Sequence, residues 1–208
     1  MNYLNHYELG AYAPHLNDAL SVTGSVLATI LAADLAIAVF HHLMDRYGDP
    51  SCPWKWFSDI IKANRLHHSY PSALLQKTPL KNAAETLAIG IAIAGVAWIL
   101  GALTWQVFLF SFVVGVSALV HRVHHIPTNR LCGFIKALQA IGLLQEKSQH
   151  SDHHRYHDVN YSVITNVVNW VLEKTRALRF LEKAIGWLGF KPYDLEAISN
   201  EERRRNKS

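Results

Sequence analysis

The feature that most limits the fold is a run of 35 residues, Thr86 to Val120, that contains no Asp, Glu, Lys, Arg or His. As a single helix this run would be about 52 Å long, whereas the hydrocarbon core of a bilayer is about 30 Å thick. We therefore expect two membrane-spanning helices over residues 86–102 and 104–120, joined by a tight turn near Gly101. One strongly tilted helix is the alternative interpretation.

Residues 19–44 form a second apolar segment, in which Asp34 is the only Asp, Glu, Lys or Arg, and they predict a further span. The segments Leu131–Leu144 and Leu178–Phe190 are too short to cross and are expected to form helices in the headgroup layer. The predicted fold is an all-α integral membrane protein. It has about three transmembrane helices, plus interfacial and cytoplasmic helices that carry a histidine-rich site for two metal ions, in a single domain over residues 1–208.

The positive charges are unevenly distributed along the chain. The net charge is +4, and all 20 Lys and Arg residues lie after residue 45 and outside the three predicted spans. The positive-inside rule then puts residues 45–85 and 121–208 in the cytoplasm and residues 1–18 on the other side. Because no basic segment precedes the first span, we do not expect a cleaved secretory signal.

Histidines are the second distinctive feature of the sequence. Eleven of the 13 lie in four clusters: His41-His42, His67-His68, His121-x-x-His124-His125 and His150-x-x-His153-His154-x-x-His157. All four clusters are at or beyond the predicted cytoplasmic ends of the spans. The orientation was inferred from Lys and Arg alone, so this placement independently supports one shared site. Imidazole suits iron, copper, nickel and zinc, and the clusters predict a metal centre.

Helical spacing selects the candidate ligands. Asp34, His41 and Asp45 lie within about 20° of one line on a helix, and His121 and His125 are one turn apart. The four histidines from position 150 onwards fall within about 100° of one helix face. The predicted metal ligands are His41, Asp45, His67, His68, His121, His125, His150, His153, His154 and His157.

The number of candidate ligands indicates two metal ions, because one tetrahedral zinc uses only four. The sequence contains no Glu-x-x-His pair, which excludes the carboxylate-rich di-iron bundle. Among the remaining histidines, His6 and His15 are expected to be ordinary surface residues. His42 points about 100° away from the line of predicted ligands and is expected to be a neighbour of the site. The role of His124 stays open.

Asp34 is the most unusual residue of the predicted spans. A carboxylate inside a membrane is costly and is by default a functional candidate. We expect a catalytic role for Asp34, in which it orients a metal-bound histidine through a hydrogen bond. Direct ligation and a hydrogen bond to a neighbouring helix are the alternatives.

Motifs in chain order over residues 33–192 resemble the plasmanylethanolamine desaturase family. The matching segments are Ala33–Gly48, with its Asp, His and Asp; Asn64–His68, which is similar to an Arg-x-His-His segment; His121–His125, of the form His-x-x-x-His; and His150–His154, of the form His-x-x-His-His. His157 stands near a further family histidine, with a spacing one residue shorter. The family includes animal and bacterial plasmalogen-forming enzymes, and related plant plastid desaturases act on acyl chains of phosphatidylglycerol.

The resemblance implies a non-haem di-iron enzyme with O2 as co-substrate and an external electron donor of the cytochrome b5 or ferredoxin type. The substrate would be a plasmanyl ethanolamine phospholipid in the bilayer, whose O-alkyl chain becomes the vinyl ether of a plasmalogen. We expect the active site on the cytoplasmic face of a bacterial inner membrane, or of the endoplasmic reticulum in a eukaryote. No nucleic-acid partner is expected.

Two other functions stay open on the sequence. A desaturase or hydroxylase of a phospholipid acyl chain can use the same iron site, because the product depends on where the second hydrogen lies. A membrane protein that binds a metal or haem without catalysis is the other alternative, since haem needs only paired axial histidines across a bundle.

Overall fold

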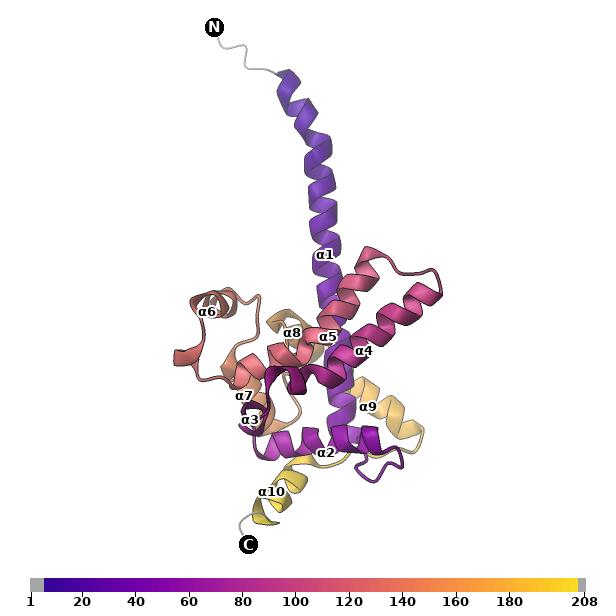
Figure 1. Cartoon of the computed structure of the whole chain (residues 1–208), viewed down its shortest axis with the longest axis vertical. Coiled ribbons are helices and arrows are strands. Elements are labelled where there is room, and N and C mark those ends of the chain that lie inside the picture. Colours follow the sequence, from indigo (N-terminus) through magenta and orange to yellow (C-terminus); the bar gives the residue numbers. More distant parts are fainter. Residues whose placement is uncertain (1–5, 206–208) are drawn as a thin grey trace.

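The structure is a computed structural model that describes the backbone of residues 6–205 and the side chains of residues 17–198, 200 and 204. The side chains of His6 and His15 therefore lie outside the described residues. The described residues form helices and no strand (Figure 1). In chain order the helices are α1 (His6–Tyr47), α2 (Lys55–Ser69), α3 (Ala73–Gln76), α4 (Pro79–Ile99), α5 (Trp105–His125), the 3-10 turn η1 (Thr128–Arg130), α6 (Gly133–Ala140), α7 (Lys147–Tyr156), α8 (Asn166–Thr175), α9 (Ala177–Trp187) and α10 (Leu195–Arg205).

Three helices are long and apolar enough to cross a membrane: α1 from Asn17 onwards, α4 and α5. The uncharged run forms α4 and α5 as a hairpin, and in its turn Gly101 has a φ of +67°, which favours glycine. Both helices begin at a threonine cap: the Thr78 and Thr104 side chains accept hydrogen bonds from backbone amides three residues later. The expected fold of three spanning helices is confirmed, and α5 continues five residues beyond the predicted span.

The α4–α5 hairpin is held by close backbone contact. A side chain added at Gly90 would place its Cβ 2.5 Å from the Ser111 carbonyl oxygen and 3.0 Å from the Gly115 Cα. The Thr86 hydroxyl donates to the Gly115 carbonyl at 2.8 Å, which links the two helices one turn away. Small residues at such a crossing let membrane helices approach closely, so α4 and α5 form a rigid wall for the space beside them.

Several of the remaining helices lie around the C-terminal half of α1, and α2 and α8 contact it (Figure 1). Ala38 of α1 is fully buried against Tyr161 and the α8 residues Val168 and Leu172. At the end of α1 the Arg46 side chain donates to a carboxylate oxygen of Glu182 on α9 at 2.9 Å. The helix α10 packs against α2. The predicted ligands of α1, His41 and Asp45, therefore lie in the part of the helix that packs against both the α4–α5 hairpin and these other helices.

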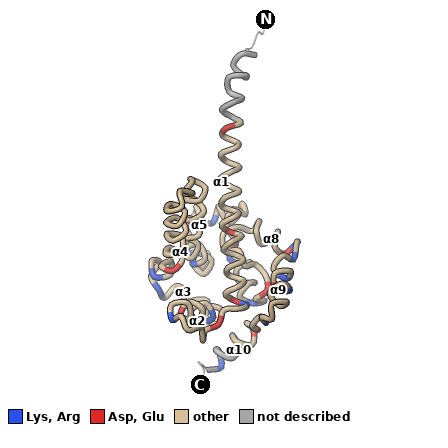
Figure 2. The backbone as a smooth tube through the Cα atoms, turned by 90° about the vertical axis from the view of Figure 1, so that its right-hand side faces the viewer, with Lys and Arg blue, Asp and Glu red and all other residues tan. Residues whose placement is uncertain are grey.

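Large apolar side chains are exposed along the three long helices and on the two predicted interfacial segments. The predicted segments contain α6 and α9, where Phe134, Phe180 and Trp187 are exposed. Figure 2 shows Lys and Arg on the half of the molecule that holds α2, α9 and α10. Residues 17–33 of α1 contain a single charged residue, Asp18. This distribution is typical of a chain with one end in lipid and the other in water.

Candidate metal centre

Nine of the ten predicted ligands converge in two groups, within each of which the candidate ligand atoms lie no more than 4.8 Å apart. The five-histidine group consists of His67, His121, His125, His150 and His154. The Asp45 group consists of His41, Asp45, His68 and His153. The two groups are neighbours, since the ring centroids of His41 and His121 are 5.7 Å apart.

Each group draws its members from three helices, and neighbouring residues in the sequence serve different groups. His67 belongs to the five-histidine group and His68 to the Asp45 group; His154 and His153 divide in the same way. Consecutive residues of a helix point about 100° apart, so α2 and α7 each present one imidazole to either side. The sequence indicated two ions, but the division of the two His-His pairs between them depends on how α2 and α7 are rotated.

The ring nitrogens of the five-histidine group are too close together to be explained by hydrogen bonds. The Nε2 atom of His150 lies 2.9 Å from that of His121, 2.8 Å from that of His125 and 3.1 Å from that of His154, and the Nε2 atoms of His67 and His121 are 3.1 Å apart. A neutral imidazole has only one N–H, so one nitrogen cannot satisfy three such neighbours. Ligand nitrogens about 2.0–2.1 Å from one metal ion are separated by roughly 3 Å. These residues therefore fit a metal ion.

The Asp45 group surrounds a carboxylate that is completely buried. One Asp45 oxygen lies 3.1 Å from the Nε2 of His68, and the other lies 3.5 Å from the Nε2 of His41 and 3.4 Å from that of His153. The Asn64 amide donates to Asp45 at 2.5 Å. The Nε2 atoms of His41 and His153 have no hydrogen-bond partner. A buried carboxylate facing several imidazole lone pairs is a donor set that suits a transition-metal ion.

Burial keeps the imidazoles of His67, His150 and His154 in the form that a metal binds. Burial, followed by the nearby imidazoles, lowers the pKa of His67, His150 and His154 well below the ordinary histidine value. The neutral ring has a lone pair available for a metal, whereas the protonated ring has none.

The histidines outside the two groups have other partners. His124 donates from Nε2 to the Val163 carbonyl at 2.7 Å. The His42 ring lies edge-on to Tyr161 at 4.7 Å, and His42 belongs to neither group. His157 belongs to neither group, and its ring centroid is 5.4 Å from that of His68. α7 ends at Tyr156, so the helical spacing that related His157 to the other α7 histidines does not extend to it; its role as a ligand stays a prediction.

Asp34 does not make the hydrogen bond to a metal-binding histidine that we expected from the sequence. It is completely buried, and its described hydrogen bonds all come from Ser162, Ile164 and Thr165, none from a histidine. The expected alignment with His41 was correct in angle only. Seven residues of helix separate the two, which is about 10 Å along the axis. Asp34 thus holds the segment between α7 and α8, a contact for which the sequence carries no signal.

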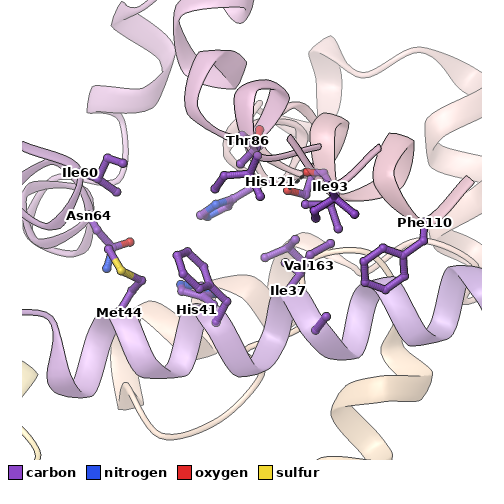
Figure 3. Close-up of a pocket in the computed structure, with 16 residues that line it drawn as sticks. Ile37, His41, Met44, Ile60, Asn64, Thr86, Ile93, Phe110, His121 and Val163 are labelled. Atoms are coloured by element: carbon purple, nitrogen blue, oxygen red, sulfur yellow. Dashed lines mark hydrogen bonds between the residues drawn. The ribbon is translucent and has the colours of Figure 1, made fainter. Parts of the chain in front are cut away.

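An apolar pocket of about 400 Å³ lies beside both groups (Figure 3). It is lined by residues of α1, α2, α4 and α5 and by Val163. His41 of the Asp45 group and His121 of the five-histidine group both line it, and Figure 3 shows the two side chains on facing sides of the pocket. Ile93 of α4 and Phe110 of α5 line the pocket closer to the turn of the hairpin than Thr86 and His121 do. The pocket therefore connects the metal groups with the lipid-facing hairpin.

Several curated proteins are similar to this chain over most of its length. It is 28% identical over 189 residues to fatty acid desaturase 4, chloroplastic, and 30% identical over 182 residues to fatty acid desaturase 4-like 2, chloroplastic, both of Arabidopsis thaliana. These alignments cover 88% and 85% of this chain but only 57% and 63% of the plant proteins. A probable fatty acid desaturase of Acanthamoeba polyphaga mimivirus is 30% identical over 171 residues, covering 78% of this chain and 82% of the viral one. No solved structure matches the chain.

The family comparison covers the same region as the site. The lipid desaturase domain family matches residues 30–194, a range that contains every member of the five-histidine and Asp45 groups and the whole of the α4–α5 hairpin. On this match, the chain belongs to the lipid desaturase domain family.

Proposed function

We propose that the protein is a membrane lipid desaturase that uses two non-haem iron ions and O2. Its substrate is a plasmanyl ethanolamine phospholipid, and its product is the vinyl ether of a plasmalogen. Family membership and the desaturase names of the relatives support the reaction class. The finer choice of an O-alkyl chain rests on the sequence motifs and on the depth of the pocket.

The observation that carries the proposal is the contact of one apolar pocket with both metal groups. His41 and His121 bring one ligand of each group to the same cavity wall, which is otherwise mainly apolar. A pocket lined by apolar side chains binds hydrocarbon, and it excludes water from the place where the reaction occurs. A C–H bond of a bound chain would then lie next to the groups that hold the ions.

The shape of the pocket favours oxidation close to the lipid headgroup. On α5 the lining runs from His121, at the end of the helix, to Phe110, which is 11 residues or about 16 Å deeper along the hairpin. On the opposite side of the histidines, the lining ends with Ile60 and Asn64 of α2. The part of the chain beyond the reacting carbons thus has a long apolar space, and the part before them has a short one.

The reaction is balanced by an external supply of two electrons. One C–H bond is broken on each of two adjacent carbons, and a C=C bond forms between them. The two hydrogens from the chain, with two protons and two electrons from outside, reduce O2 to two water molecules. Iron held by the two groups would supply the O2 chemistry that inert C–H bonds require. The protein's residues bind and orient the chain, and Asn64, which lines the pocket, donates a hydrogen bond that holds Asp45.

We infer that the histidine end of the molecule faces the cytoplasm. All Lys and Arg residues lie after residue 45 and outside the central apolar parts of the long helices, which supports this orientation by the positive-inside rule. A cytoplasmic face also gives access to a soluble or membrane-bound electron donor of the ferredoxin or cytochrome b5 type. The bacterial inner membrane is the location that we propose.

Lipid mass spectrometry tests the reaction. Cells that express the protein are supplied with an alkyl-ether ethanolamine phospholipid and are grown with and without O2. We expect an O2-dependent product that is two hydrogens lighter and is cleaved by mild acid, as a vinyl ether is. His121→Ala should abolish the product, and Lys55→Ala, at an exposed position outside the pocket lining, should leave it unchanged.

Each other result contradicts the proposal in a specific way. An acid-stable product of the same mass identifies an acyl or remote desaturase, and a product with one more oxygen identifies a hydroxylase. If no lipid changes and the purified protein has the Soret absorption of haem, the protein is a haem-binding protein instead.

A further inference from the structure

The segment between α7 and α8 acts as a frame of backbone carbonyls for three imidazoles. The Val159 carbonyl accepts from Nδ1 of His153 at 2.8 Å, the Tyr161 carbonyl from Nδ1 of His41 at 3.0 Å, and the Val163 carbonyl from Nε2 of His124 at 2.7 Å. The three histidines come from three helices, α7, α1 and α5. One short stretch of irregular chain therefore sets the orientation of side chains that are far apart in the sequence.

These hydrogen bonds determine which ring nitrogen is free. A carbonyl oxygen can only accept, so Nδ1 of His41 and Nδ1 of His153 carry the proton, and Nε2 of each ring keeps its lone pair. In both rings it is Nε2 that faces Asp45, at 3.5 Å and 3.4 Å. The frame thus presents two imidazole lone pairs to the Asp45 group.

The five-histidine group has no such support among the described residues. The buried Nδ1 atoms of His67, His150 and His154 have no hydrogen-bond partner. The frame therefore serves one metal group and not the other, although the two groups are adjacent.

Asp34 holds the frame in place. Its two carboxylate oxygens accept from the Ser162 hydroxyl at 2.8 and 2.7 Å, from the Thr165 amide and hydroxyl at 2.8 Å each, and from the Ile164 amide at 3.2 Å. Hydrogen bonds of this kind, from neutral donors to a buried carboxylate, are among the stronger ones in proteins. Asp34 stands on α1 seven residues before His41, so a single helix carries both the ligand and the anchor of the carbonyl that orients it.

We propose that Asp34 is a positioning residue for the Asp45 group: by anchoring residues 162–165, it holds the Val159 and Tyr161 carbonyls that fix the proton on Nδ1 of His153 and His41. This inference rests on the proposed two-ion centre, and it adds that the two ions depend differently on Asp34. It also gives the intramembrane carboxylate a role without contact with metal or substrate.

Iron content tests this dependence. Asp34→Asn keeps the size of the side chain, but its NH2 group cannot accept the bonds that the carboxylate oxygen accepts. We expect the purified, iron-loaded variant to fall from two iron ions per chain to one. Asp45→Asn, which removes a candidate ligand of the same group, should lose the same ion, so the visible spectra of the two cobalt-substituted variants should agree.

Two results would overturn the role of Asp34: retention of both ions with an unchanged cobalt spectrum, or proportional loss of both ions in Asp34→Asn and also in the milder Ser162→Ala. Ser162→Ala removes a single hydroxyl donor, and it keeps the test decisive if Asp34→Asn folds poorly.

Histidine tautomers are a second readout that needs no metal and no activity. In the metal-free protein, nitrogen-15 NMR of labelled histidine should show Nδ1–H rings for His41 and His153, assigned with His41→Gln and His153→Gln. Asp34→Asn should convert both rings to a mixture of tautomers. Unchanged tautomers would refute the positioning role, even if iron binding or lipid desaturation had failed for another reason.

Discussion

The Nε2 atoms of His121 and His150 lie 2.9 Å apart, although the two residues are on different helices and 29 positions apart in the sequence. The close contact joins the end of α5 to α7. His150 also has the Nε2 atoms of His125 and His154 within 3.1 Å, so it is the central member of the five-histidine group. A variant at this position should affect that group more than any other single change.

His150→Gln is predicted to remove the ion of the five-histidine group and to abolish lipid oxidation, because a side-chain amide is a much weaker transition-metal ligand than the central imidazole. Iron analysis of the purified protein should give about one ion per chain. His42→Gln is the matched control, since His42 is also a buried histidine but belongs to neither group. Two ions in the His150 variant, or one in the His42 variant, would contradict the assignment of the groups.

The metal-free protein is predicted to lose stability as the pH falls below about 6.5. Burial lowers the pKa of His67, His150 and His154 in the folded chain, while the unfolded chain has the ordinary histidine pKa of about 6.5. The unfolded state therefore binds more protons in this range, so acidification favours it. The charged form gains little from its surroundings, because the groups that face these rings are mainly other imidazoles.

Thermal unfolding in detergent, after removal of metal by a chelator, measures this dependence. The Tm should be nearly constant between pH 7 and 8 and should fall steadily from pH 6.5 to 5. His67→Gln combined with His154→Gln should make the decline shallower. A Tm that is constant down to pH 5 would show that these rings are not buried as the structure has them.

Ile93→Trp is predicted to reduce turnover at least tenfold without loss of iron, because a larger side chain fills the pocket through which the lipid chain passes. Ile91→Trp is the matched control on the same helix, since Ile91 is 72% exposed and does not line that pocket. Product formation by mass spectrometry and iron content should be measured on both proteins. Equal turnover in the two variants would show that the substrate lies elsewhere.

Gly90→Val is predicted to destabilise the protein by about 1–3 kcal/mol, the usual cost of an overpacked contact. The new Cβ would stand 2.5 Å from the Ser111 carbonyl oxygen, where the backbones of α4 and α5 approach each other. Gly95→Val is the control, because no atom lies within 4 Å of a Cβ at that position. The Tm of the Gly90 variant should fall clearly below that of the Gly95 variant, and equal values would contradict the close crossing.

Cysteine labelling tests the orientation in the membrane. Cys132 is exposed and lies beyond α5, on the side that we propose to be cytoplasmic. A maleimide that cannot cross membranes should label it in inverted vesicles and not in intact cells. Asp18→Cys in a Cys52→Ser, Cys132→Ser background should give the reverse pattern of a Cys52→Ser protein that keeps Cys132, and the same pattern for both positions would contradict the three-span topology.

The sequence was sufficient to predict the parts of the fold that depend on whether a segment lies in lipid or in water. The length of the uncharged run predicted two helices with a turn near Gly101, because a bilayer is too thin for one. The expected convergence of the histidine clusters is present for nine candidate ligands, which lie toward the C-terminal ends of α1 and α5 and on the shorter helices α2 and α7. These inferences needed only length, charge and the helical repeat.

The remaining features depend on contacts between distant segments. The division of His67 and His68 between two groups follows from the rotation of α2, which a pattern of residues does not specify. Asp34 is separated from His41 along the axis of α1. The helical-wheel argument compares only the angles of side chains around that axis, so it does not detect this separation. The role of His124 depends on the Val163 carbonyl, and backbone carbonyls carry no residue signature.

The unbroken helix α1 has a consequence for the choice of carbon. The same helix contains the apolar segment and carries His41 and Asp45, so its length sets the distance between the bilayer and the reacting centre. Each residue added to α1 before His41 lengthens the helix by about 1.5 Å and rotates the part that carries His41 and Asp45 by about 100°. Only changes close to whole turns keep both side chains facing their partners. Relatives with a longer or shorter α1 before the position of His41 would therefore oxidise a lipid tail at sites that differ in steps of roughly 5.4 Å, rather than one carbon at a time.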